Sequence, residues 1–127
     1  MHTITDVRQT QAWCTYVSKL GWQSIKVGDG WGFVKKITML GPIIKFPRLA
    51  LPISWEELDA VVKKIKPWLI ILEPYCFPNS QAILELKTRG FFRSNLATTP
   101  EKTLHLDLTK NEGKLWKDLR ASTRAKI

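Results

Sequence analysis

One acidic residue, Glu73, stands where a catalytic base is expected. It follows the apolar run WLIIL and immediately precedes Pro74, so it lies at the carboxyl end of a predicted strand. Ligand groups in α/β sheets tend to lie beyond the carboxyl ends of strands, and a carboxylate between apolar walls can accept a proton as a general base. The alternative is a side chain that points into solvent where the strand ends. Trp68 lies near the start of the same strand, where packing at the rim of the core is the expected role.

A second set of candidates lies in the last predicted helix, which is rich in cations. Arg120 and Arg124 belong to a basic face that also contains Lys114, Lys117 and Lys126. Such a face can contact tRNA or a phosphate-bearing substrate, although basic helical faces are commonly only solvated. The helix also carries a largely apolar stripe at every fourth position, namely Leu115, Leu119, Thr123 and Ile127. An open apolar stripe predicts exposed hydrophobic surface and hence self-association.

Motifs for other common chemistries are not found. The chain contains no GxSxG, GxxxxGK[ST] or GxGxxG sequence. The glycine-rich GDGWG at 28–32 is better explained as a hairpin turn than as a ligand loop. Cys14 and Cys76 form no CxxC, and neither histidine lies near them at a metal-ligand spacing, so a zinc site is not expected.

The composition predicts one globular domain with an anionic partner. A chain of 127 residues that is 44% hydrophobic can bury a single core. Its formal net charge of +9 favours nucleic acid, a phosphate-rich ligand or a membrane surface as partner, unless the basic surface is merely solvated. The polar N-terminus lacks the apolar core of a signal peptide, and the most apolar run, PWLIILEPYCF, is too short to span a bilayer. We therefore expect a cytoplasmic protein.

Helices and strands alternate along the chain. Helices are expected over 11–20, 55–66, 81–89 and 110–127, with caps at Thr10, Ser54–Glu57, Asn79 or Ser80, and Thr109–Glu112. Strands are expected over 22–27, 31–40, 68–72, 91–96 and 102–108. The proline-rich segment 41–52 should be an edge strand or a loop, and WLIIL suits a strand buried on both faces. This order predicts an α/β or α+β domain with a mixed central sheet, compatible with GNAT-type acyltransferase folds among many others.

Five short motifs occur in the order known from the Fem-type (FemABX) peptidoglycan-bridge aminoacyltransferases, which the chain resembles. They are QTQAWCTYVSKLGW, LGPII, WLIILEP, RGFFRSNLATTPEKTLHLDLT and LRASTRAKI. The first resembles a Q-[ST]-x-x-W helix that ends in Gly-Trp, and the last two resemble a P-x-x-T-x-x-L-D-L run followed by R-x-x-I on a helix. The resemblance runs in register across nearly all of the chain.

The resemblance implies an activity. Such enzymes move an amino acid from an aminoacyl-tRNA to an amine on the stem peptide of a peptidoglycan precursor, UDP-linked or lipid-linked, without a metal or organic cofactor. Glu73 stands at the position of an acidic residue proposed as catalytic base, and Trp68 at that of a substrate-contacting tyrosine. A base at Glu73 would deprotonate the attacking amine while basic residues hold the precursor's phosphates.

The resemblance also implies that residues 1–127 form the N-terminal GNAT-like domain of a longer two-domain enzyme, truncated at the C-terminus and inactive alone. A substrate-binding lysine of the family falls at Val17, and the basic residue before Gly-Pro is Leu40. Phosphate binding at that site is therefore in question. The alternatives are another GNAT-type N-acyltransferase, whose thioester-binding Q/R-x-x-G-x-G/A loop is not found, a non-catalytic module that binds tRNA or an anionic ligand, and a degenerate remnant.

Overall fold

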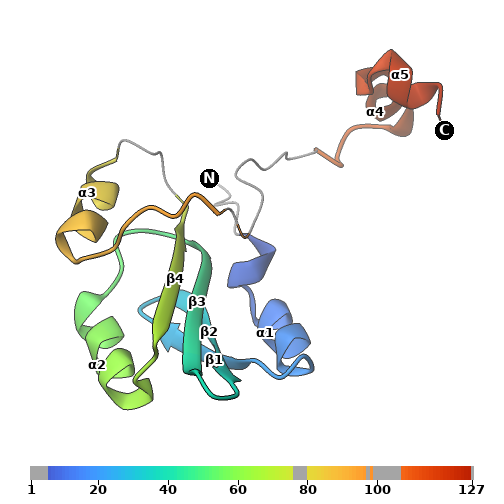
Figure 1. Ribbon diagram of the computed structural model, residues 1–127. Coiled ribbons are helices and arrows are strands. Elements are labelled where there is room, and N and C mark those ends of the chain that lie inside the picture. Colours follow the sequence, from blue (N-terminus) through green and yellow to red (C-terminus); the bar gives the residue numbers. More distant parts are fainter. Residues whose placement is uncertain (1–5, 76–79, 97, 99–106, 127) are drawn as a thin grey trace. The chain divides into compact units, whose positions relative to one another are not determined.

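The computed structural model describes residues 6–75, 80–96, 98 and 107–126. The chain divides into two compact units, residues 1–94 and 95–127. The first contains the sheet and its flanking helices, and the second contains two short helices (Figure 1).

The first unit is a mixed α+β domain, which confirms the predicted class. Its sheet has the strand order β1-β2-β3-β4, with antiparallel pairing from β1 to β3 and parallel pairing of β3 with β4. The elements are η1 (Val7–Gln9), α1 (Gln11–Ser18), β1 (Gln23–Val27), β2 (Gly30–Ile37), β3 (Gly41–Leu49), α2 (Trp55–Ile65), β4 (Leu69–Pro74) and α3 (Gln81–Thr88). Helix α2 connects the two parallel strands, as parallel pairing requires.

The predicted caps explain where the helices begin and end. The Thr10 hydroxyl accepts the backbone N–H of Trp13 at the start of α1, and the Ser54 hydroxyl accepts that of Glu57 at the start of α2. Ser80 is the N-cap residue of α3, although its side chain makes no capping hydrogen bond. Gly21 follows α1 with φ +81°, a conformation that glycine adopts without strain. No helix in the described ranges is both long and apolar enough to cross a membrane.

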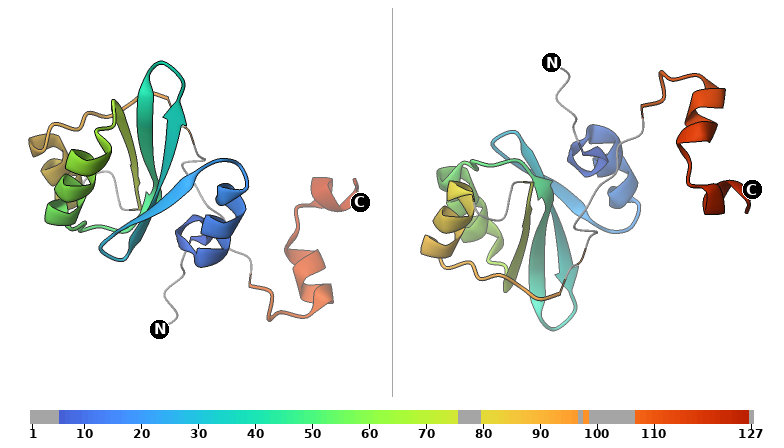
Figure 2. Two further views of the ribbon diagram at one scale, coloured as in Figure 1. Left: turned by 90° about the horizontal axis from the view of Figure 1, so that it is seen from below. Right: turned by 90° about the horizontal axis from the view of Figure 1, so that it is seen from above.

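Two apolar clusters hold the sheet between its helices. The larger contains Ile44, Phe46 and Leu49 of β3 and packs against the apolar side of α2. The smaller joins Cys14 and Val17 of α1 to Phe33 of β2. Helices α2 and α3 thus lie on one side of the sheet and α1 on the other (Figure 2). Full burial of each large side chain contributes about 1.5–3 kcal/mol.

The proline-rich strand β3 is interior, so the prediction of an edge strand or loop is wrong. It pairs with β2 on one side and β4 on the other. Pro42 lies at its second residue, and Pro47 lies where the pairing with β4 shifts register between Phe46 and Leu49. Arg48 has φ +49° at the same irregularity. A bulge tolerates proline because the ladder hydrogen bond is already interrupted there.

The prediction that strand β4 is buried on both faces is also wrong. In the described part of the sheet it is an edge strand, and its side chains are exposed or half-buried. Only Ile70 and Leu72 pack against the larger cluster. A continuous apolar run therefore does not determine whether a strand lies in the interior or at the edge of its sheet.

Residues 91–96, predicted as a strand, form no regular strand. The backbone N–H of Phe91 instead donates to Leu86 O at 3.0 Å, and its ring lies 6.3 Å from that of Trp55. The chain thus packs back onto the helices after α3. Most of the predicted strand 102–108 lies outside the described residues, as does Cys76.

The second unit contains two short helices, α4 (Glu112–Asp118) and α5 (Ala121–Arg124). The prediction of a single long helix over 110–127 is therefore wrong. Leu119 and Arg120 are extended between them, with ψ 145° each. The Arg124 guanidinium donates to Lys117 O at 2.9 Å, which satisfies a carbonyl freed at the end of α4. The apolar stripe is therefore not one continuous face, and self-association stays a prediction.

The N-cap of α4 is Asn111 and not Thr109. Thr109 instead hydrogen-bonds to Asp107 through its hydroxyl, at 2.6 Å, and its backbone N–H, at 3.0 Å. These bonds, the hydroxyl first, lower the pKa of the Asp107 carboxyl.

Replacing Thr109 with valine should therefore raise the pKa of Asp107 toward its ordinary value, which a carboxyl-detected NMR titration would measure. Because the folded-state pKa is lowered, the stabilisation is present above the ordinary pKa of aspartate and is lost as the pH falls through the lowered value. Thr109→Ser keeps the hydroxyl and should keep the low pKa. An unchanged pKa in Thr109→Val would contradict this assignment.

Candidate functional site

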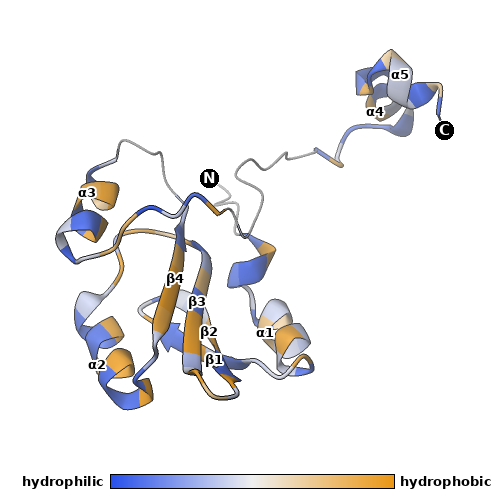
Figure 3. Cartoon of the chain, viewed as in Figure 1, coloured by the Kyte–Doolittle hydropathy of each residue, from blue (hydrophilic) through white to orange (hydrophobic). Residues whose placement is uncertain are grey.

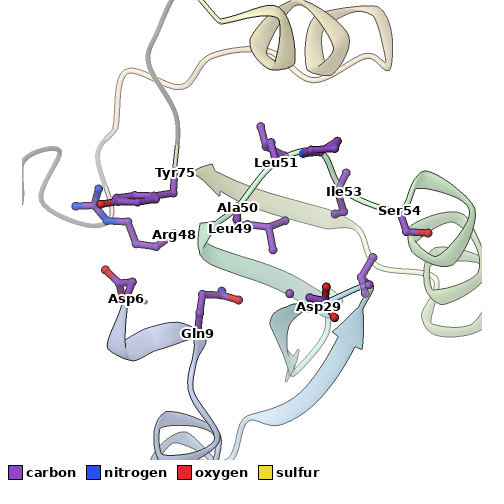
Figure 4. A pocket seen from close by; sticks show the side chains of 14 residues that line it. Asp6, Gln9, Asp29, Arg48, Leu49, Ala50, Leu51, Ile53, Ser54 and Tyr75 are labelled. Atoms are coloured by element: carbon purple, nitrogen blue, oxygen red, sulfur yellow. The ribbon is translucent and has the colours of Figure 1, made fainter. Parts of the chain in front are cut away.

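A cavity of about 490 Å³ lies at the carboxyl ends of the two parallel strands (Figure 4). There Leu49 pairs with Pro74, and the Tyr75 N–H donates to Leu49 O at 2.8 Å. The lining comes from η1 and its N-cap residue, the β1–β2 turn with the adjoining strand ends, the end of β3 with the segment that follows it, and the residue that follows β4. Its members are Asp6, Gln9, Val27–Gly30, Arg48–Ser54 and Tyr75. Sheet edges of this kind are common ligand sites.

The glycine-rich stretch GDGWG contains the hairpin turn between β1 and β2, as predicted, and residues 28–30, the turn and the first residue of β2, also line the cavity. Gly28 has φ +57°, and its N–H donates to the Glu57 carboxylate, which ties the turn to the start of α2. Of the two hydrogen bonds of the predicted capping box, the one from the Glu57 N–H to the Ser54 hydroxyl is present. The Glu57 carboxylate accepts the Gly28 N–H in place of the second. Gly30 and Gly32 leave room for the side chains of Leu49 and Phe46. The turn is thus positioned by packing and one charged hydrogen bond.

Gln9 fixes η1 against the sheet beside the cavity. Its amide donates to the carbonyls of Trp31, at 3.0 Å, and Pro47, and its oxygen accepts the Trp31 N–H at 2.7 Å. Thr10 caps α1, and Trp13 packs against the smaller apolar cluster. Each residue of the Q-T-x-x-W motif therefore has a structural role. The bulge at Pro47 supplies one of the carbonyls that Gln9 binds.

The cavity brings together groups of both charges. Arg48 and Tyr75 lie beside each other at one side, and Asp6 and Asp29 come from η1 and the β1–β2 turn (Figure 4). The Asp6 carboxylate also accepts the Arg8 N–H at 2.9 Å and lies 3.4 Å from the Arg8 guanidinium. A guanidinium binds phosphate or carboxylate, whereas carboxylates bind ammonium groups. The cavity therefore suits a ligand that carries both charges.

Glu73 lies one residue before the end of β4, so its predicted position is confirmed. Its carboxylate is 3.3 Å from the Lys45 ammonium on the adjacent strand, and its side chain is 16% exposed. It is not among the residues that line the cavity, but Tyr75, two residues further along, is. The catalytic role of Glu73 stays a prediction.

Trp68 is not brought close to Glu73. It immediately precedes β4, at the end of the strand opposite Glu73, and its backbone N–H donates to Pro42 O at 3.1 Å. Five residues of extended strand separate the two side chains by about 16 Å. A single small substrate group cannot touch both.

Arg120 and Arg124 belong to the second unit. Arg120 is the N-cap residue of α5, and Arg124 donates to the carbonyls of Trp116 and Lys117. The latter contact gives Arg124 a local structural role. The basic helical face on which the tRNA interpretation depends is divided between two helices.

Arg48, Asp29 and Tyr75 were not singled out by sequence reasoning. The GDG turn was a usable signal for Asp29, because the turn contacts the start of α2 and residues 28–30 line the cavity. Among the described residues, no group of three His, Cys, Asp or Glu side chains is placed to hold a metal ion.

Comparisons with known proteins give no match: no family model, curated protein or solved structure matches the chain.

Proposed function

We propose that the chain is the GNAT-like domain of a Fem-like aminoacyltransferase, which transfers an amino acid from aminoacyl-tRNA to an amine of a peptidoglycan precursor. The single observation that supports this most is the cavity of mixed charge at the carboxyl ends of the parallel strands β3 and β4. The element order from α1 to α3 is compatible with the GNAT type, since a helix and three antiparallel strands precede the crossover helix α2.

The charges around the cavity fit an aminoacyl ester better than a purely anionic ligand. An aminoacyl end carries an α-ammonium group, for which Asp29 and Asp6 offer carboxylates, and lies next to a phosphodiester, for which Arg48 offers a guanidinium. The net charge of +9 adds a long-range attraction for tRNA. These features define the expected donor as an aminoacylated nucleotide end.

The reaction needs one proton acceptor, and the proposed one is Glu73, which lies two residues before the lining residue Tyr75 but does not itself line the cavity. The acceptor amine attacks the ester carbonyl, a C–N bond forms, and the C–O bond to the ribose breaks. The proton that the amine loses passes to the Glu73 carboxylate and then to the departing ribose oxygen. Lys45, 3.3 Å from that carboxylate, would orient it.

A transfer assay tests the proposal. Protein expressed from the complete reading frame would be incubated with aminoacyl-tRNA and a UDP-linked muropeptide, and mass spectrometry would follow the muropeptide. We expect a mass increase of one aminoacyl residue that requires the aminoacylated tRNA. Binding of aminoacyl-tRNA without any transfer to UDP-linked or lipid-linked precursor would contradict the catalytic proposal.

A non-catalytic module that binds an aminoacylated or anionic ligand is the second candidate. It is favoured by the position of Glu73, which does not line the cavity. In this case Arg48→Met would abolish ligand binding, and no transfer would be observed with any acceptor. Another N-acyltransferase that uses an acyl thioester would instead transfer from the thioester without tRNA.

A further inference from the structure

The end of the sheet opposite the cavity has an unusual surface. Strand β1 begins there, β2 ends there, and β3 and β4 begin there, so residues 19–23, 35–43 and 63–69 meet (Figure 1). The Lys35 Nζ donates to Leu20 O at 3.4 Å, and the Trp68 N–H donates to Pro42 O at 3.1 Å, which joins the three segments. We call this surface the lysine end.

The lysine end exposes large apolar side chains at the tip of a turn. Met39 is 100% exposed and Leu40 is 59% exposed in the β2–β3 turn, where Figure 3 shows hydrophobic residues. Leu20 and Trp68 beside it are 51% and 50% exposed. Met39 also has φ +76°, a conformation that glycine and asparagine adopt more readily. Stability in water therefore does not explain why methionine occupies this position.

The same surface is cationic and contains no acidic residue. The segments 19–23, 35–43 and 63–69 contain no Asp or Glu, and all six of their lysines are exposed, namely Lys19, Lys35, Lys36, Lys63, Lys64 and Lys66. Of the acidic side chains outside these segments, Asp6 and Asp29 lie at the cavity end, and Glu56, Glu57 and Asp59 lie in the N-terminal half of α2. Positive charge is thus concentrated around the exposed apolar turn.

We propose that the lysine end binds the surface of an anionic lipid bilayer, with Met39 and Leu40 inserted among the acyl chains. Apolar insertion and electrostatic attraction are the two signals that peripheral binding combines. Lysine stems can lie along the interface with their ammonium groups at the anionic headgroups, and Trp68 suits the headgroup level. The cavity at the other end of the sheet would then face away from the bilayer. This inference does not rest on the proposed enzymatic activity.

The combination of exposed lysines with exposed apolar side chains favours a bilayer over nucleic acid as the partner. Lysines and the half-exposed Trp68 would serve either partner, but the exposed aliphatic side chains of Met39 and Leu40 offer neither charge nor an aromatic face to a polynucleotide. A bilayer uses both features, because its headgroups are anionic and its interior is apolar.

Co-sedimentation with vesicles tests the proposal. The full chain should sediment with vesicles of equal parts phosphatidylglycerol and phosphatidylcholine, and should remain in solution with pure phosphatidylcholine. Met39→Asn combined with Leu40→Ser should weaken binding at least about tenfold. Asparagine suits the positive φ, so the fold should be retained, as circular dichroism would verify. Leu84→Ser removes a leucine of similar exposure to Leu40, 53% against 59%, from α3 and should leave binding unchanged.

A charge-matched pair of variants locates the electrostatic contribution. Lys36→Glu with Lys66→Glu should reduce vesicle binding about thirtyfold or more. Lys114→Glu with Lys117→Glu changes the net charge equally in the second unit and should have little effect. Equal losses in both pairs would overturn the assignment to the lysine end, as would full binding by the Met39 and Leu40 variant. Binding of an oligoribonucleotide at this end without vesicle binding would assign it to nucleic acid instead.

Discussion

Replacing Gly32 with alanine should lower the free energy of unfolding by about 2 kcal/mol and the melting temperature by roughly 10 °C. A Cβ at this position would lie 2.7 Å from Phe46 Cδ1 and 2.9 Å from Cζ, closer than real Cβ atoms approach. Phe46 is fully buried in the larger apolar cluster, so its ring cannot move aside without disturbing Ile44 and Leu49. Thermal unfolding followed by circular dichroism would measure the loss.

Two further variants separate this steric effect from a general effect of alanine. Gly113→Ala in α4 meets only Asn111 Oδ1 at 3.7 Å and should be neutral or stabilising. In a double-mutant cycle, Phe46→Leu should make Gly32→Ala less costly, because the smaller side chain leaves room for the methyl group. Additive losses in the cycle would contradict the close approach of Gly32 to Phe46.

The elements set by local signals were predictable from the sequence. Helices α1 and α2 follow from Thr10 and Ser54, whose hydroxyls cap the backbone, and from apolar residues on one face. The β1–β2 hairpin follows from Gly28 and Gly30 between two β-prone runs. In each case the stabilising contact lies within a few residues of the signal, so no knowledge of the rest of the fold was required.

The failures concern contacts that reach beyond the local repeat of a helix or strand. Strand β3 can be interior although it contains Pro47, because the register shift there removes the need for a backbone N–H at that residue. That shift is a feature of the pairing with β4, and the Pro47 carbonyl accepts a hydrogen bond from the distant Gln9 side chain. The break between α4 and α5 leaves carbonyls that the Arg124 side chain binds from beyond the break. Neither arrangement has a signature in the local sequence pattern.

The candidate site was predicted only in part for the same reason. Glu73 was placed correctly at the end of a strand, because an apolar run followed by Glu-Pro marks that end locally. The cavity was missed, because Arg48, Asp29 and Tyr75 come from three separated segments that only the sheet brings together. Trp68 lies at the opposite end of the same strand, so sequence proximity was a poor guide to its role.

Changing Glu73 to glutamine should lower kcat for aminoacyl transfer by about two orders of magnitude or more, with little change in KM for aminoacyl-tRNA. Glutamine has nearly the same shape as glutamate but cannot take the proton that the attacking amine must lose. The assay is single-turnover transfer to the muropeptide, with tRNA binding measured separately. Glu56→Gln removes an exposed carboxylate at the start of α2 and should retain full activity.

Lys45 complicates the interpretation of this variant, because it would lose the carboxylate 3.3 Å from its ammonium. An effect of the broken ion pair alone should appear as a lower melting temperature. Lys45→Met leaves the base in place but removes its charged neighbour, so it should reproduce the stability loss while retaining more transfer than Glu73→Gln. If both variants lose transfer only in proportion to their stability, the pair is structural and Glu73 is not the base. If Glu73→Gln binds aminoacyl-tRNA normally, melts near the parent and fails to transfer, proton acceptance is the function that was removed.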